Sequence, residues 1–170
     1  MPTILTTRVE GCILHIENVG FEDMSKWVLL SKEYDNYVRE AALDLTEWYE
    51  GSDTSFSFDE YMGRRIHKKE AFMAANELGE CCGIIAISRE NNNITFFGTF
   101  HKFDTLSVGD FLIRYALSEL DESKRIKINE LKSNSRQIKK NYALLDKFGF
   151  IYQGEVLENG VLVNCMVKNP

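Results

Sequence analysis

The sequence predicts an α+β fold: a mixed, mostly antiparallel central sheet flanked by helices, with one βαβ crossover and a C-terminal hairpin. Three observations indicate this fold. Two short runs of β-formers open the chain and two more close it, each pair joined by a glycine-containing turn. Three further strand-length runs follow one another between residues 70 and 100. An amphipathic pattern at Asp110–Leu120 then separates the strand-like runs Ile94–Phe100 and Arg125–Leu131, as is typical of a parallel crossover.

Length and charge limit the class of protein. The 170 residues are enough for one domain with a substantial core, so we expect a single domain over residues 1–170. Hydrophobic residues make up 44% of the chain and charged residues 27%, as in ordinary globular proteins. The formal net charge of −6 argues against nucleic acid as a partner, because binding a phosphate backbone depends on clustered lysines and arginines.

The four cysteines are not arranged for disulfides or metal binding. Cys81 and Cys82 are adjacent, and neighbours in a strand point to opposite faces, so they cannot close an ordinary bridge. With Cys12 and Cys165 they form no C-x-x-C or cysteine–histidine spacing typical of zinc sites. We therefore expect reduced thiols, no metal and a cytoplasmic protein. Charged residues near the N-terminus precede any long apolar run, so neither a signal peptide nor a membrane span is expected.

The first part of the chain predicts a hairpin followed by helices. Thr3–Val9 and Cys12–Ile16 are its two strands. A long helical pattern then runs to Gly51, as one helix or as two with a bend, and Phe58–His67 is predicted as a further short helix. The apolar positions of the long pattern recur at steps of three and four residues: Trp27, Leu30, Tyr34, Tyr37, Val38, Ala41, Leu45 and Trp48.

The middle of the chain predicts an antiparallel meander. Its strands are Glu70–Asn76, Cys81–Ser88 and Ile94–Phe100, joined by connections rich in turn-forming residues. The third strand contains Gly98. A glycine inside a strand often marks a bulge or a place where another group approaches the backbone closely.

Helices and strands alternate in the last part of the chain. Ser107 and Asp110 fit the S/T-x-x-D/E capping pattern at the start of the crossover helix. Ser133-Asn134-Ser135 precedes a second helix, and Phe150–Glu155 and Val161–Lys168 are predicted as the closing hairpin. The apolar face of the second helix is Ile138, Tyr142, Leu145 and Phe148.

Four local motifs follow one another between residues 70 and 155. The meander ends in Phe97-Gly98-Thr99, and Asp104–Gly109 leads into a helix. Ile126-x-Ile128 lies on the next strand, and Leu144–Phe150 reads L-L-D-K-F-G-F. In this order and spacing the chain resembles the GNAT acetyltransferase family, whose pyrophosphate loop reads Q/R-x-x-G-x-G/A and whose corresponding helix ends L-Y-E-K-x-G-F. The resemblance implies a GNAT-like fold and direct transfer of an acetyl group from acetyl-CoA to an amine.

Four positions depart from the family pattern. Asp104 replaces the Gln or Arg of the loop, and Ser107 replaces its first glycine. His101 stands where proline is common, and Leu145 occupies the position of the tyrosine that often protonates the departing thiolate. Counted from Asn134, the helix is also about one turn longer than in the family.

The resemblance implies that acetyl-CoA, a co-substrate, lies between two parted strands and against the loop before the crossover helix. Free backbone groups of the strands would pair with pantetheine, and loop amides with the helix N-terminus would receive the diphosphate. Alternatively, carboxylates simply satisfy this helix terminus without a ligand. The coenzyme-binding residues so implied are Phe97, Gly98, Thr99, Asp104, Thr105, Leu106, Ser107, Val108, Gly109, Asp110 and Asn134.

Tyr142 and His101 are the candidate catalytic residues. Tyr142 lies three residues before Leu145 on the same helical face and would replace the missing general acid. Its alternative role is that of a core aromatic in the apolar stripe. His101 ends the central strand and would act as a base or orient a water, since histidine titrates near neutrality. Its alternative role is that of a solvated loop residue.

Carboxylates and aromatic residues crowd into the connection between the first two helices. In GNAT relatives this region lines the acceptor pocket, and acids with aromatic faces suit a cationic amine. The alternative is that the aromatic residues belong to the core and the acids to a solvated face. The residues predicted to bind the acceptor, a small-molecule or peptide amine, are Trp48, Tyr49, Glu50 and Phe58.

Two functions remain open at this point. The first is a cytoplasmic, acetyl-CoA-dependent N-acetyltransferase. The second is a catalytically degenerate GNAT-like domain that binds a ligand or a partner, to which Asp104, Ser107 and Leu145 point. A homodimer formed by pairing of strand edges is compatible with either.

Overall fold

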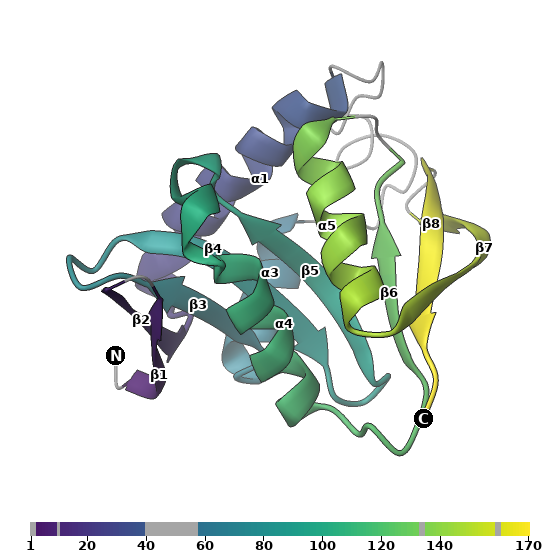
Figure 1. The fold of residues 1–170 in the computed structure, drawn as a ribbon, viewed down its shortest axis with the longest axis horizontal. Coiled ribbons are helices and arrows are strands. Elements are labelled where there is room, and N and C mark those ends of the chain that lie inside the picture. Colours follow the sequence, from purple (N-terminus) through teal and green to yellow (C-terminus); the bar gives the residue numbers. More distant parts are fainter. Residues whose placement is uncertain (1–2, 10, 40–57, 133–134, 159–160) are drawn as a thin grey trace.

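The computed structural model describes residues 3–9, 11–39, 58–132, 135–158 and 161–170. These residues form one eight-stranded sheet with helices on both faces (Figure 1). All neighbouring strands described are antiparallel except for one parallel pair near the middle of the sheet. The predicted α+β fold, with its two terminal hairpins, meander and single crossover, is confirmed.

The elements follow the predicted order. The first part contains β1 (Thr3–Val9), β2 (Cys12–Asn18), the 3-10 turn η1 (Phe21–Asp23), α1 (Met24–Arg39), α3 (Phe58–His67), β3 (Ala71–Ala75), β4 (Cys81–Ser88) and β5 (Asn93–Thr99). The second part contains the 3-10 segment η2 (His101–Leu106), α4 (Val108–Glu119), β6 (Ile126–Glu130), α5 (Arg136–Lys147), β7 (Phe150–Glu158) and β8 (Val161–Lys168). Across the sheet the order is β1-β2-β3-β4-β5-β6-β8-β7. The predicted helical pattern beyond residue 39 lies outside the described residues.

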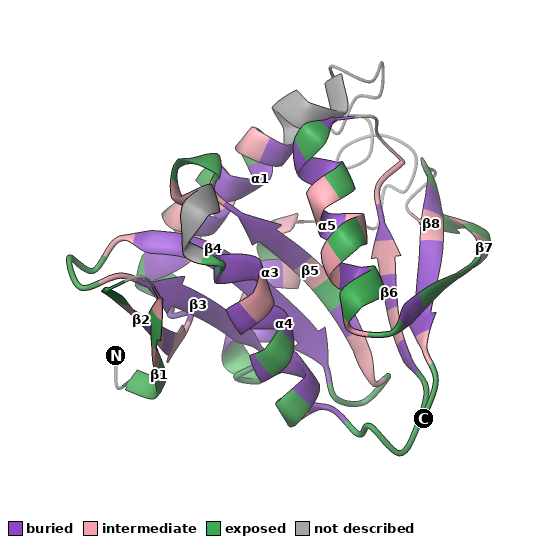
Figure 2. Ribbon diagram, viewed as in Figure 1, coloured by how far each residue is buried: buried purple, intermediate pink, exposed green. Residues whose placement is uncertain are grey.

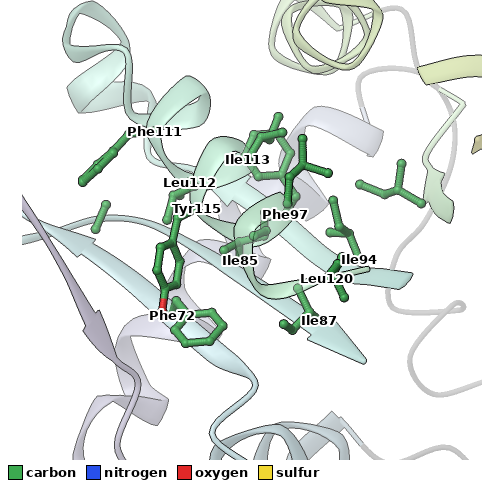
Figure 3. Close-up of a cluster of buried hydrophobic side chains, with 14 of the residues drawn as sticks. Phe72, Ile85, Ile87, Ile94, Phe97, Phe111, Leu112, Ile113, Tyr115 and Leu120 are labelled. Atoms are coloured by element: carbon green, nitrogen blue, oxygen red, sulfur yellow. The ribbon is translucent and has the colours of Figure 1, made fainter. Parts of the chain in front are cut away.

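One face of the sheet is covered by α4 and α5 (Figure 1). The apolar stripe of α4 is buried against β3, β4 and β5 because its residues recur at the helical period (Figure 3). The Tyr115 ring meets the Phe72 ring edge to face, with centroids 4.9 Å apart. This cluster holds the crossover helix, and therefore its N-terminus, in a fixed place over the sheet.

The other face is covered by α1 and α3. Trp27 and Leu30 of α1 and Met62 of α3 are fully buried there. The Trp27 ring packs edge to face against Phe96 of β5, with centroids 5.5 Å apart. Because helices lie on both faces, every residue of β3 and β4 is buried (Figure 2). None of the helices described is both long and apolar enough to cross a membrane.

The two predicted helix caps differ in the structure. Ser135 caps α5 as predicted, because its hydroxyl accepts a hydrogen bond from the Ile138 N–H at 3.2 Å. Ser107 is the residue before α4, but its side chain makes no capping hydrogen bond. Its backbone is left-handed (φ 52°, ψ 33°), whereas a capping serine normally has an extended backbone. Ser107 is therefore the N-cap residue by position, as predicted, but the side-chain hydrogen bond of the capping pattern is not formed.

The parallel strands β5 and β6 pair only where they begin. Asn93 lies opposite Lys127 and Ile94 opposite Ile128, and the register ends there. Beyond these pairs the strands diverge, and α5 crosses in front of the divergence (Figure 1). Ile138 of α5 belongs to the apolar cluster on the far side, with Trp27 and Leu30 of α1. At this opening, residues from helices on the two faces of the sheet therefore pack in one cluster.

Candidate active site

Along the opening, the edge of β5 beyond Ile94 pairs with no described strand. The Phe100 N–H donates to Cys82 O of β4, so the preceding residue, Thr99, directs its N–H to the other edge, toward β6. There the Thr99 N–H donates to the Tyr34 hydroxyl at 3.2 Å. The Tyr34 ring reaches this edge by passing over Gly98, where an added Cβ would lie 2.9 Å from Tyr34 Cε2. Tyr34 is the close neighbour that the glycine in this strand accommodates.

A cavity of about 290 Å³, here called the helix cavity, lies between the N-terminus of α4 and α5. The left-handed backbone of Ser107 turns the chain into α4, so the amides of the first helical turn face the cavity region. Gly109 fits closely, since an added Cβ would lie 2.7 Å from Leu144 Cδ1. The cavity is lined by Thr99, Phe103, Ser107, Val108, Gly109, Asp110, Gln137, Lys140, Asn141, Ala143, Leu144 and Lys147.

Cations surround the one described carboxylate of the helix cavity. Asp110 accepts hydrogen bonds from Arg114, at 3.0 Å, and from Lys147. Burial acts to raise the pKa of Asp110, but the hydrogen bonds from Lys147 and Arg114 outweigh it and hold the pKa below its usual value. Lys140 also lines the cavity. Among the described lining residues of the helix cavity there are thus two lysines, Lys140 and Lys147, and one carboxylate, Asp110.

A chain of polar side chains crosses the opening. The amide nitrogen of Asn141, on α5, donates to the Tyr34 hydroxyl at 3.3 Å and to Glu130 Oε2 at 3.4 Å. One turn earlier on α5, Gln137 Nε2 donates to Thr99 Oγ1 at 3.1 Å. Spacing of four residues puts both amides on the same face of the helix. Side chains from α1, β5, β6 and α5 thus meet at one point.

Glu130 and Tyr34 are the two titratable groups at this point. Burial raises the pKa of Glu130 to about 7, although the hydrogen bonds from the Leu131 N–H, at 2.9 Å, and from Asn141 favour the ionised form. Burial likewise raises the pKa of Tyr34 to about 12. At neutral pH the site therefore holds a proton donor beside a carboxyl group that readily changes its protonation state.

A second, smaller cavity of about 60 Å³, here called the acidic cavity, opens on the other side of the polar chain. Tyr34, Phe97 and Glu130 line it, together with Glu158 at the end of β7. Burial raises the pKa of Glu158 as well. The full lining is Tyr34, Thr95, Phe96, Phe97, Ile128, Asn129, Glu130, Leu131, Glu158 and Val163.

No model of a known protein family matches the sequence, and no curated protein matches it. Solved structures do match the fold. A GNAT-family acetyltransferase from Listeria monocytogenes gives a TM-score of 0.63 over 98% of this chain and 100% of its own, at 13% identity. Naa50 from Arabidopsis thaliana, in complex with the bisubstrate analogue CoA-Ac-MVNAL, gives 0.63 over 92% of this chain and 98% of its own, at 14% identity. Ard1 from Thermoplasma volcanium gives 0.63 over 92% and 97%, at 13% identity.

The chain has the GNAT fold. The resemblance predicted from the sequence is thereby confirmed at the level of the fold. In this GNAT fold, the opening and the helix cavity are formed by strands and helices that the four sequence motifs mark, whereas the acidic cavity is also lined by Tyr34 of α1 and Val163 of β8.

Within the GNAT fold, the predicted coenzyme residues occupy several environments. Thr99 and the residues from Ser107 to Asp110 line the helix cavity. Phe97 lines the acidic cavity, and Gly98 packs beneath Tyr34. The backbone of Asp104, Thr105 and Leu106 lies in η2. Asn134 is outside the described residues.

Neither predicted catalytic residue lines the two cavities, although the Tyr142 hydroxyl contacts the backbone of Glu130 and Leu131, which line the acidic cavity. The Tyr142 hydroxyl donates to Leu131 O at 2.8 Å and accepts from Asn164 Nδ2 at 3.0 Å, in a half-buried position. Burial raises the pKa of Tyr142 to about 12. His101 is exposed at the start of η2, where its backbone N–H donates to Glu33 Oε1 at 2.8 Å.

One of the predicted acceptor residues is described. Phe58 begins α3 and is half-buried, with its ring stacked on Tyr61 and edge-on to Trp27. Trp48, Tyr49 and Glu50 lie outside the described residues.

Sequence reasoning missed three residues of the opening: Tyr34, Glu130 and Asn141. For Glu130 a signal was available, because it follows Ile126 and Ile128 at the two-residue step of a strand and so takes an inward position. A carboxylate at an inward position is unusual and often functional. Asn141 and Tyr34 each lie on an amphipathic helix, and no local pattern distinguishes them from their neighbours.

Proposed function

We propose that this protein is a divergent GNAT N-acetyltransferase that moves an acetyl group from acetyl-CoA directly to a primary amine. The observation that carries the proposal is the opening between β5 and β6. Within it, Glu130 and Tyr34 stand between the helix cavity and the acidic cavity. Direct transfer needs a passage for the thioester, a proton acceptor and a proton donor at one place.

The helix cavity suits the anionic, elongated coenzyme. Amides at the start of α4 suit a diphosphate, because a helix N-terminus favours negative charge. Lys140, Lys147 and Arg114 add positive charge around Asp110. Beyond Ile94 the edge of β5 pairs with no described strand, so an extended arm would add there as in strand addition, displacing the Tyr34 hydroxyl from the Thr99 N–H. Acetyl-CoA would bring the activated acetyl group, held as a thioester.

The polar chain supplies the proton transfers. Glu130, with a pKa of about 7, accepts a proton from the acceptor ammonium, so that the amine can attack. The hydroxyl of Tyr34 stays protonated at neutral pH and donates its proton to the sulfur as the carbon–sulfur bond breaks, and the proton that the newly bonded nitrogen loses restores the hydroxyl. Asn141 holds the two groups in register through its hydrogen bonds to both.

Calorimetry with acetyl-CoA and a thioester-cleavage assay with a panel of primary amines test the proposal. We expect binding in the micromolar range, typical of enzyme substrates, and amine-dependent release of free thiol. Absence of heat and of a thermal shift at millimolar acetyl-CoA would overturn it.

A ligand-binding domain without catalysis is the second candidate. It is favoured by Leu145, a fully buried leucine at the position of the family's acid, and by the Tyr34 hydroxyl, which already occupies the Thr99 N–H. Tyr34→Phe separates the candidates. The enzyme proposal expects kcat to fall about 10- to 100-fold, with coenzyme affinity kept or improved. The second candidate expects no turnover in either protein.

A further inference from the structure

Two hydrogen-bond donors converge on one oxygen atom inside the opening. The backbone N–H of Thr99, on β5, donates to the hydroxyl oxygen of Tyr34 at 3.2 Å. The side-chain amide of Asn141, on α5, donates to the same oxygen at 3.3 Å. All three residues are buried. The hydroxyl oxygen of Tyr34 therefore marks a place, away from solvent, at which N–H groups from a strand and from a helix both point.

This place lies between the two cavities. Thr99 and Asn141 line the helix cavity, and Tyr34 lines the acidic cavity. If the arm of the coenzyme adds to β5 here, as in the proposed function, it needs the Thr99 N–H that Tyr34 now occupies. A carbonyl oxygen can accept two hydrogen bonds, as the hydroxyl oxygen does in this structure. The carbonyl oxygen of the thioester can therefore take its place between the two donors.

The donors around this oxygen favour negative charge on it. Burial raises the pKa of Tyr34 to about 12, but the hydrogen bonds from Asn141 and from the Thr99 N–H act in the opposite direction, toward the phenolate. The charge of Glu130 acts against a phenolate. This charge is absent once Glu130 has accepted the proton of the ammonium group. Buried donors that the fold already holds in place stabilise a developing charge more strongly than water does.

We infer that Asn141 is a catalytic residue, whose side-chain amide, together with the Thr99 N–H, stabilises the negative charge that develops on the thioester oxygen. The inference rests on the proposed function and adds a residue to its machinery. The carbonyl oxygen replaces the hydroxyl oxygen of Tyr34 between the two donors. The displaced hydroxyl moves toward the sulfur, which is bonded to the same carbon. One N–H of Asn141 stays with Glu130 and the other meets the carbonyl oxygen.

The step conserves atoms and charge. The lone pair of the amine nitrogen forms a bond to the carbonyl carbon, and the π electrons of the C=O bond move onto the oxygen between Asn141 and Thr99. When these electrons return, the carbon–sulfur bond breaks, and the sulfur leaves with the bonding pair and takes the proton of Tyr34. The excess proton of the nitrogen restores the Tyr34 hydroxyl, and Glu130 releases the ammonium proton to solvent.

Infrared spectroscopy of bound acetyl-CoA tests the contact without turnover. The carbonyl carbon is isotopically labelled, and no amine is present. Hydrogen bonds to the oxygen weaken the C=O bond, so we expect the stretching frequency to be lower in the complex than in water. In Asn141→Leu, which keeps the size of the side chain but removes its donors, most of this shift should be lost. No shift in the natural protein, or the same shift in both proteins, would overturn the inference.

Steady-state kinetics measure the catalytic effect. We expect kcat of Asn141→Leu to fall about 10²- to 10³-fold, as for the loss of one donor to a developing oxyanion. The Kd for acetyl-CoA should change less than about threefold, since the charge develops only in the transition state. A role confined to positioning Glu130 and Tyr34 would lower kcat without moving the carbonyl frequency, and that result would also overturn the inference.

Asn164→Leu is the matched control. Asn164 is a half-buried asparagine of β8 whose amide donates to the Tyr142 hydroxyl, and it lines neither the helix cavity nor the acidic cavity. We expect its kcat to stay within about twofold of the natural value and the carbonyl frequency to be unchanged. An equal loss of kcat in the two folded variants would contradict a specific role for Asn141.

Failure of the inference differs from failure of the proposed function. Turnover with a carbonyl frequency that does not depend on Asn141 contradicts the inference alone and leaves the acetyltransferase standing. Absence of acetyl-CoA binding in calorimetry contradicts both.

Discussion

Two influences act in opposite directions on the carboxyl group of Glu130. Burial favours its neutral form, whereas hydrogen bonds from the Leu131 N–H and from Asn141 favour its ionised form. The resulting pKa of about 7 leaves a substantial ionised fraction at neutral pH. A base with this pKa can take a proton from an ammonium group and still release it to solvent afterwards.

Glu130→Gln tests this assignment through the pH dependence of the rate. With the natural residue, we expect kcat/KM to rise with pH up to about 7 as Glu130 loses its proton. The variant should lose this limb and about 10²- to 10⁴-fold of kcat, since glutamine cannot accept the proton. Steady-state rates between pH 5.5 and 9 measure both effects. Unchanged affinity for acetyl-CoA in calorimetry serves as the control, and a variant that keeps the limb would contradict the role.

The ends of two helices define the helix cavity. The N-terminus of α4 contributes amides and Asp110, and the last turn of α5 contributes Lys147. Asp110 alone would oppose an anion at this helix terminus. Lys147 and Arg114 pair with Asp110 and offset its negative charge. The sequence of the loop alone does not show this pairing.

Lys147→Ala tests whether this pairing matters for the coenzyme. The variant leaves Asp110 with Arg114 only and removes one positive charge from the rim. We expect the Kd for acetyl-CoA to rise roughly three- to fivefold at low salt, because exposed charges contribute modestly. The difference should shrink at 0.5 M salt, where such interactions are screened. Calorimetry at two salt concentrations measures it.

Lys139→Ala is the matched control, because Lys139 is an exposed lysine of α5 that does not line the cavity. Equal Kd values for the two variants would show that the total charge of the protein affects binding but the location of the lysine does not. That result would count against the helix cavity as the coenzyme site.

The buried carboxyl group of Glu130 in the opening affects the free energy of unfolding of the whole molecule. Burying a carboxyl group costs less free energy when it is protonated than when it is ionised. Glu130 has an ordinary pKa of 4.5 when unfolded and about 7 when folded. The unfolded chain therefore binds fewer protons than the folded chain between these two values, and the free energy of unfolding falls as pH rises through this window.

We therefore expect Glu130→Gln to stabilise the fold at alkaline pH. At pH 8 the gain is at most about 3 kcal/mol, corresponding to the difference in pKa. At pH 4, below both pKa values, Glu130 is mostly protonated in both states and nearly all of the gain should be lost. Urea unfolding at both pH values measures the free energies, and Glu155→Gln, on the exposed face, controls for the loss of one charge. A variant less stable than the natural protein at pH 8 would contradict the argument.

Local signals in the sequence determined the elements of this protein. Residue period identifies strands and helices, and turn residues separate them, so both hairpins, the meander and the crossover could be predicted. Ser135 likewise acts within one helical turn, and its cap could be predicted. The missing side-chain hydrogen bond of Ser107 could not, since its left-handed backbone depends on how η2 and α4 meet.

The tertiary structure alone decided which side chains meet in the opening. Tyr34 and Asn141 are separated by 107 positions and lie on helices that cover opposite faces of the sheet. The period of a helix shows which of its residues face inward, but it does not show that a sheet parts beneath them. Because β5 and β6 separate after two residue pairs, Asn141 can contact both Tyr34 and Glu130 at the opening.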